Sequence, residues 1–203
     1  MTTFPDHTLA ALILFSFVSS ITPGPNNLML LASGVNFGWR RTLPHMLGVG
    51  LGFTFMVTLV GLGLGQVFVR VPVLYAVLKY AGAAYLLWLA WKIARSGPMG
   101  GEEGAAAGTP MTFLQACAFQ WVNPKAWIMA VTAVATYVMV ADATVNALLV
   151  AAVFGIVNLP CIAVWVLFGV GMRRILSDPS RVRLFNWLMA ALLVASLWPV
   201  FAG

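Results

Sequence analysis

The sequence predicts an all-α membrane protein with six transmembrane helices. The helices form two inverted three-helix repeats, and helices 1 and 4 are broken near the bilayer midplane. Of the 203 residues, 62% are hydrophobic and only 8% are charged, whereas a soluble domain is about half apolar and about a quarter charged. The apolar residues gather into six long segments, and the first and fourth segments each contain a proline-centred break.

Each apolar segment is long enough to cross a bilayer core, which takes about 20 residues of α-helix. The segments cover residues 8–37, 42–67, 72–94, 111–139, 144–171 and 184–202. We expect one domain over residues 1–203, with repeat 1 at about 8–94, a link at 95–110 and repeat 2 at about 111–202. Three spans per half is an odd number, so the second half enters the membrane from the opposite side. Such inverted repeats are typical of transporters.

The basic residues orient the chain. Loops one, three and five hold eight of the eleven Lys and Arg residues, and the opposite side holds two. Because the more positive loops remain in the cytoplasm, we predict that both termini lie outside and that the 95–110 link is cytoplasmic. The expected setting is a bacterial-type inner (plasma) membrane. The basic residues are scattered over short loops, which argues against nucleic-acid binding.

The first break is the sequence TPGPNN at residues 22–27. Its prolines remove the backbone donors that would pair with carbonyls four residues earlier, so the helix must stop. Gly24 can cap a new half-helix that begins at Pro25. The free N–H groups of that half-helix would attract a carboxylate, and the bare carbonyls before the break would attract an ammonium. A plain proline kink packed by its neighbours is the alternative. The predicted substrate-binding residues here are Pro23, Gly24, Pro25, Asn26 and Asn27.

The second break is Asn123-Pro124-Lys125, and Pro124 lies 99 positions after Pro25. Asn123 suits the N-cap, and Pro124 suits the first helical position. A lysine near the bilayer centre costs about 2.5–3.5 kcal/mol, and no acidic residue lies within the six segments. We therefore expect its partner to be missing from the chain, so that a substrate carboxylate would fit. A lysine that extends to the interface is the alternative. All three residues are predicted to bind substrate.

Few groups in the spans can carry a proton. The five acidic residues fall in loops or at the ends, which leaves His45 and Lys125 as candidates for proton coupling. For His45, an interfacial position without a coupling role is the alternative. The spans contain no cluster of carboxylates or histidines, so we expect no metal site and no cofactor. Asn158 and Pro160 predict a further kink in the fifth segment.

Several motifs occur together in one order: ITPGPNN, AGAAYLLWLAWKI at residues 81–93, and NPKAW in the fourth segment. This combination resembles the LysE/RhtB amino-acid exporter family. Within that family, it is most similar to the exporters of cysteine, O-acetylserine and neutral amino acids. The resemblance covers about residues 5–200. It implies six spans, export of amino acids or small derivatives from the cytoplasm, proton-gradient coupling and no enzymatic activity. The matching motif positions are Pro23, Gly24, Pro25, Asn26, Asn123, Pro124 and Lys125.

Two other functions are weighed against export. A membrane thiol–disulfide electron carrier would need a cysteine pair, but Cys117 and Cys161 both lie away from the breaks. A passive channel or structural subunit would show no coupled transport. The sequence leaves open which amino acid is carried, which ion is coupled and whether the chain forms a homo-oligomer.

Overall fold

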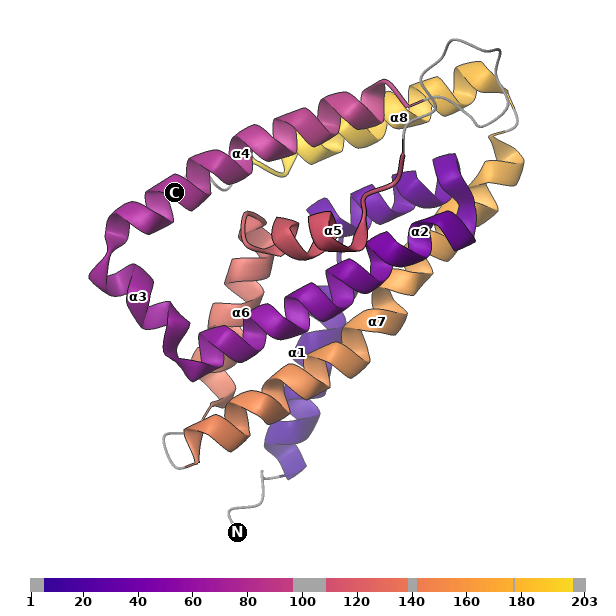
Figure 1. The fold of residues 1–203 in the computed structure, drawn as a ribbon. Helices are drawn as coiled ribbons and strands as arrows, with labels where there is room; N and C mark the ends of the chain where they lie inside the picture. The colour runs from indigo at the N-terminus through magenta and orange to yellow at the C-terminus, as the bar shows by residue number, and fades with distance from the viewer. Residues whose placement is uncertain (1–5, 97–108, 139–141, 177, 199–203) are drawn as a thin grey trace.

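The computed structural model describes residues 6–96, 109–138, 142–176 and 178–198. This part of the chain is helical apart from its connections and contains no strand (Figure 1). The elements in order are α1 (Asp6–Ile21), α2 (Pro25–Leu59), a π-helical segment (Val60–Leu64), α3 (Gly65–Arg70), α4 (Pro72–Ala94), α5 (Phe113–Gln120), α6 (Pro124–Tyr137), α7 (Ala143–Ile175) and α8 (Pro179–Ala195). The predicted all-helical class is confirmed.

The outside of the helices is apolar, and part of the inside is polar. Leu14 and Ile156 are 62% and 73% exposed, while Asn27 and Asn186 are 4% and 0% exposed. Large apolar side chains also fill the inside, but a water-soluble protein exposes far fewer of them on its surface. Two helical stretches, Pro25–Leu64 and Ala143–Arg173, are long and apolar enough to cross a membrane by length and composition. These features agree with a membrane protein.

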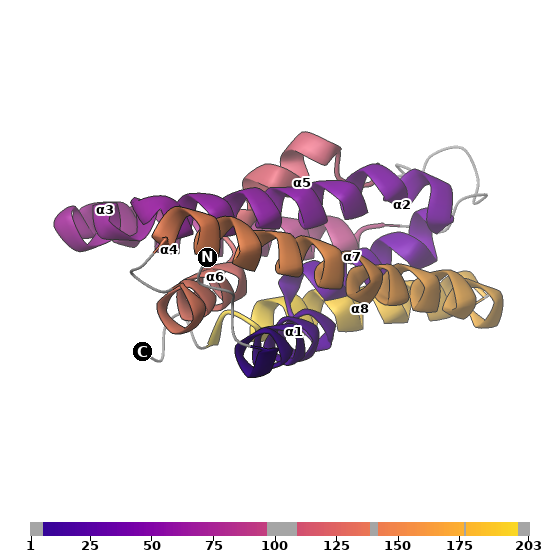
Figure 2. The same ribbon diagram turned by 90° about the horizontal axis from the view of Figure 1, so that it is seen from below.

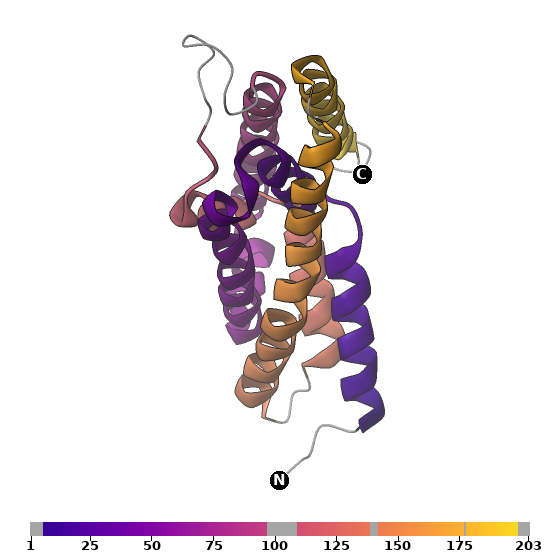
Figure 3. The same cartoon turned by 90° about the vertical axis from the view of Figure 1, so that its right-hand side faces the viewer.

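Helix α2 reverses direction at Gly38. The φ angle of Gly38 is 75°, a left-handed value that glycine adopts readily. The hydroxyl oxygens of Ser33 and Thr42 lie 2.9 Å apart, although nine residues of straight helix would separate them by roughly 13 Å. The chain therefore folds into a helical hairpin (Figure 3). The predicted boundary between the first two segments, after residue 37 and before residue 42, is correct in position, but one glycine makes the turn and the helix continues on both sides of it.

Helices α2 and α7 form the centre of the molecule and lie side by side (Figures 1 and 2). They cross closely at two glycines: a Cβ on Gly34 would lie 2.5 Å from the carbonyl oxygen of Val166, and Gly169 has a similar contact with Leu31. Such close backbone approach is common where helices pack in membranes. Helices α4 and α8 pair on one side of this centre (Figure 1).

The helix boundaries agree with the predicted segments to different degrees. The third segment matches α4, while the fourth is divided into α5 and α6. Helix α8 begins at Pro179 instead of residue 184, because Asp178 caps it by accepting from the Ser180 N–H at 2.8 Å. The hydroxyl and N–H of Ser180 hold the pKa of the Asp178 carboxyl below its usual range. Pro160 lies within α7 and does not interrupt it.

Candidate functional site

The first predicted break is present. Helix α1 ends at Ile21, and α2 begins at Pro25. Gly24 between them is fully extended, with φ −178° and ψ 175°, and no side chain caps the start of α2. The chain therefore presents backbone groups of both polarities in the gap, carbonyl oxygens from α1 and N–H groups from α2.

The carbonyls at the end of α1 are not bare, contrary to expectation. The side-chain amide of Asn27 donates to the carbonyl oxygens of Ser20 and Thr22, each at 2.8 Å. The indole N–H of Trp165 in α7 donates to the carbonyl oxygen of Ile21 at 3.0 Å. Because buried carbonyls need donors, these two side chains make the open end of α1 tolerable inside the molecule.

The second predicted break is also present. Helix α5 ends at Gln120, and α6 begins at Pro124. The Asn123 side chain accepts from the Lys125 N–H at 3.1 Å, which is the predicted N-cap. The indole N–H of Trp127 donates to the carbonyl oxygen of Trp121 at 2.8 Å. This break is stabilised by residues within its own segment.

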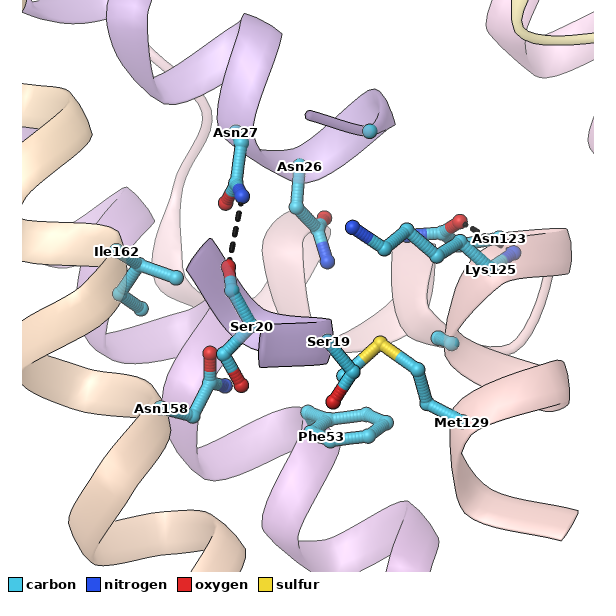
Figure 4. Close-up of a pocket in the computed structure, with 12 residues that line it drawn as sticks. Ser19, Ser20, Asn26, Asn27, Phe53, Asn123, Lys125, Met129, Asn158 and Ile162 are labelled. Carbon is cyan, nitrogen blue, oxygen red and sulfur yellow. Dashed lines mark hydrogen bonds between the residues drawn. The ribbon is translucent and has the colours of Figure 1, made fainter. Parts of the chain in front are cut away.

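Lys125 joins the two breaks. Its ammonium donates to the Thr22 carbonyl at 2.7 Å, to the Thr22 hydroxyl at 2.9 Å and to the Pro23 carbonyl at 3.1 Å. The expectation that its partner is missing from the chain is therefore wrong, because the carbonyl end of α1 supplies it. Gly24 makes this approach feasible, since a Cβ there would lie 2.5 Å from Lys125 Cδ. Figure 4 shows the lysine extending along the gap toward Asn26.

A second link between the breaks comes from Gln120, whose side chain we did not predict in the site. Its amide exchanges hydrogen bonds with that of Asn26 at 2.8 and 3.3 Å and also donates to the Ala116 carbonyl at 2.8 Å. Gln120 is fully buried. A polar residue beside a break in an apolar segment was the available signal, but its partner lies 94 positions away in the sequence.

A small cavity of about 30 Å³ lies between the breaks. A single water needs about 10–15 Å³ by this measure, so the cavity is smaller than an amino acid. The predicted residues that line it are Gly24, Asn26, Asn27, Asn123 and Lys125. The three predicted prolines shape the breaks without lining the cavity. The wall also includes Ser19, Ser20, Phe53 and Asn158, which we did not predict (Figure 4).

The remaining candidates lie elsewhere. His45 is buried in α2 and lines a different cavity from Lys125. Both cysteines are free. Cys117 donates to the Gly48 carbonyl at 3.3 Å, and Cys161 is buried in α7. The part of the chain that the structure describes has no group of three residues that could hold a metal ion.

Comparison with known proteins gives consistent results. A family model described as LysE type translocator matches residues 17–197. A cysteine/O-acetylserine efflux protein of Klebsiella pneumoniae is 32% identical over 191 residues, which are 92% of this chain and 93% of that protein. A protein of the same name from Escherichia coli K12 is 36% identical over 132 residues, which are 64% of this chain and 66% of that protein. No solved structure matches the chain.

Proposed function

We propose, from the premise that this chain belongs to the LysE type translocator family, that it is a secondary transporter that exports amino acids or small derivatives. Membership makes the chain a multi-pass membrane protein and not an enzyme. The relatives are named for cysteine and O-acetylserine efflux, so small polar amino acids and their O-acyl derivatives are the first substrates to test. The proposed location is a bacterial inner membrane.

The observation that carries this proposal is the position of the Lys125 ammonium. Three oxygens of Thr22 and Pro23 hold it, so the carbonyl end of α1 is already a binding site for an ammonium group. An amino acid carries one ammonium and one carboxylate. We propose that the substrate ammonium takes the place of Lys125 at these oxygens. The substrate carboxylate then pairs with Lys125 and with the uncapped N-terminus of α2.

This exchange leaves no charge at the breaks without a partner. Lys125 loses carbonyl oxygens and gains a carboxylate, while the oxygens of Thr22 and Pro23 lose one ammonium and gain another. A buried pair with one partner removed costs about 3–5 kcal/mol, and the exchange avoids that cost at each end. The cavity of about 30 Å³ has to widen as the substrate enters, so binding and movement of the half-helices occur together. That coupling is what a carrier requires.

The proton-gradient coupling implied by the family is proposed to act through Lys125. It is the only titratable side chain among the described residues that line the small cavity. His45 belongs to a separate cavity and is the less direct candidate. Efflux that continues unchanged when the pH gradient is collapsed would remove coupling from the proposal and favour a passive channel.

The decisive test replaces Lys125 with methionine. We expect Lys125→Met to insert normally and to lose efflux of O-acetyl-L-serine and L-cysteine from preloaded proteoliposomes by a hundredfold or more, which corresponds to about 3–5 kcal/mol. Lys79→Met removes a lysine of α4 that does not line the cavity and is the matched control. Near wild-type efflux by Lys125→Met, normalised to the amount of protein in the membrane, would rule out this site.

The proposed topology has six spans in two inverted repeats, both termini outside and the 95–110 link in the cytoplasm. Most of that link, including Glu103, lies outside the described residues. We expect a cysteine at position 103, in a chain with Cys117 and Cys161 changed to serine, to react with a membrane-impermeant maleimide only after the cells are opened. Labelling of intact cells at that position would reverse the topology. Retained efflux in the parent double-serine chain would also exclude thiol–disulfide chemistry.

A further inference from the structure

A second and larger cavity, of about 280 Å³, lies apart from the two breaks. Its wall comes from both halves of α2, the last turns of α4 with the two residues after it, and the chain at residues 109–111. Small-molecule pockets begin at about 300 Å³, and a cavity of about 150 Å³ admits benzene. The space is therefore suited to a molecule of six to ten non-hydrogen atoms, roughly.

His45 lines this cavity from the second half of α2. The side chain is 2% exposed, and neither ring nitrogen has a hydrogen-bond partner in the described part of the structure. An imidazole always has at least one N–H to donate, and a buried polar group without a partner is unfavourable. A histidine in this position thus has an unused donor beside a space that can hold a ligand.

Part of the cavity wall carries positive charge. Lys92, in the last turn of α4, and Arg95, directly after it, are among the lining residues. The Lys92 ammonium lies 4.8 Å from the centre of the Trp88 ring, and the Arg95 guanidinium lies 4.5 Å from that of Trp91. Stacking on an aromatic face orients a guanidinium and leaves its edge free to bind a carboxylate. No carboxylate is among the described lining residues.

We infer that this cavity binds a small molecule with one carboxylate and a short apolar body. His45 and Arg95 hold the carboxylate, and Met29, Leu89 and Ile93 contact the apolar body. A zwitterion fits less well, since its ammonium would meet two cations and no described carboxylate. This site is separate from the proposed substrate site at Lys125, and the inference does not depend on which amino acid is exported.

The test uses three ligands with the same carbon skeleton. Hexanoate has the carboxylate alone, L-norleucine adds an ammonium, and hexanamide is uncharged. The full-length protein in nanodiscs is titrated with each ligand by calorimetry, with empty nanodiscs as the blank. We expect hexanoate to bind at least roughly tenfold more tightly than either analogue, because only hexanoate satisfies the cations and the His45 donor without adding a positive charge.

Two variants locate the binding. We expect His45→Phe and Arg95→Gln each to weaken hexanoate binding roughly tenfold or more, while Lys125→Met leaves it unchanged. Arg95 is exposed, so Arg95→Gln keeps the test valid if His45→Phe does not fold. Equal binding of all three ligands, no hexanoate binding, or binding that is lost in Lys125→Met and retained in Arg95→Gln would each overturn the inference. None of these results would touch the proposed export.

Discussion

The two helix breaks differ in what stabilises them. At the first break, the carbonyls of Ser20, Ile21 and Thr22 accept hydrogen bonds from Asn27 and from two side chains distant in sequence, Trp165 and Lys125. The second break is stabilised by Asn123 and Trp127, from its own segment. The first break therefore changes whenever α6 or α7 moves, whereas the cap and the indole contact of the second break stay within its own segment. The links from the second break to the first are the side chains of Gln120 and Lys125. This difference makes the first break the natural place for partners to be exchanged with a substrate.

Proline alone does not explain either break. Pro44 and Pro160 lie inside α2 and α7, which continue through them. At the first break, two prolines flank a glycine that is fully extended, and at the second break an asparagine supplies the N-cap. A proline in the middle of a helix removes one hydrogen bond and bends the chain, but a complete stop also needs a residue that starts the next helix.

The largest effect in this comparison is expected from Asn27. Asn27→Leu has a similar volume but removes the donor shared by the Ser20 and Thr22 carbonyls. The Thr22 carbonyl keeps the Lys125 ammonium, so the Ser20 carbonyl is the buried acceptor that loses its donor, at a cost of about 1–3 kcal/mol. We expect lower thermal stability in detergent and at least a tenfold loss of efflux. Asn123→Leu, which removes only a cap, is the matched change at the second break. An equal or larger loss in Asn123→Leu would contradict the difference between the breaks.

The next effect concerns an equivalent pair of indoles. Trp165 donates to the Ile21 carbonyl and Trp127 to the Trp121 carbonyl, and each acceptor lies near the end of the helix that precedes its break. Replacing either tryptophan with phenylalanine removes one hydrogen bond, worth about 1 kcal/mol net. We expect Trp165→Phe to lower the maximal efflux rate, because it couples α7 to the first break, and Trp127→Phe to lower stability without that effect.

The control for this pair is efflux measured at saturating substrate, with thermal unfolding of the same preparations. If the two variants reduce the efflux rate equally, α7 has no special connection to the first break. The proposed movement would then have to involve both breaks to the same degree.

The sequence was sufficient for the features that depend on neighbouring residues. Both breaks and the Asn123 cap were predicted because proline and asparagine act within a few positions of themselves. The bonds from Lys125 to Thr22 and Pro23 span 103 and 102 positions, so only the folded chain brings these groups together. The burial of His45 was missed for the same reason. The sequence predicted where the chain turns between the first two segments. It did not predict that one left-handed glycine, Gly38, makes the turn, because the charges beside it suggested a loop.

The smallest effect is expected from the cap of the second break. Asn123→Ala removes the acceptor for the Lys125 N–H and should lower stability by about 1 kcal/mol. Asn123→Ser retains a capping oxygen, so it should be close to wild type. Because neither change removes the side-chain contacts of Gln120 and Lys125 with the first break, efflux should follow the fraction of folded protein in both variants. Measuring efflux and thermal unfolding of Asn123→Ala and Asn123→Ser tests whether efflux follows stability. If Asn123→Ala is as stable as wild type but exports slowly, the Asn123 side chain acts on the substrate itself and is not only a helix cap.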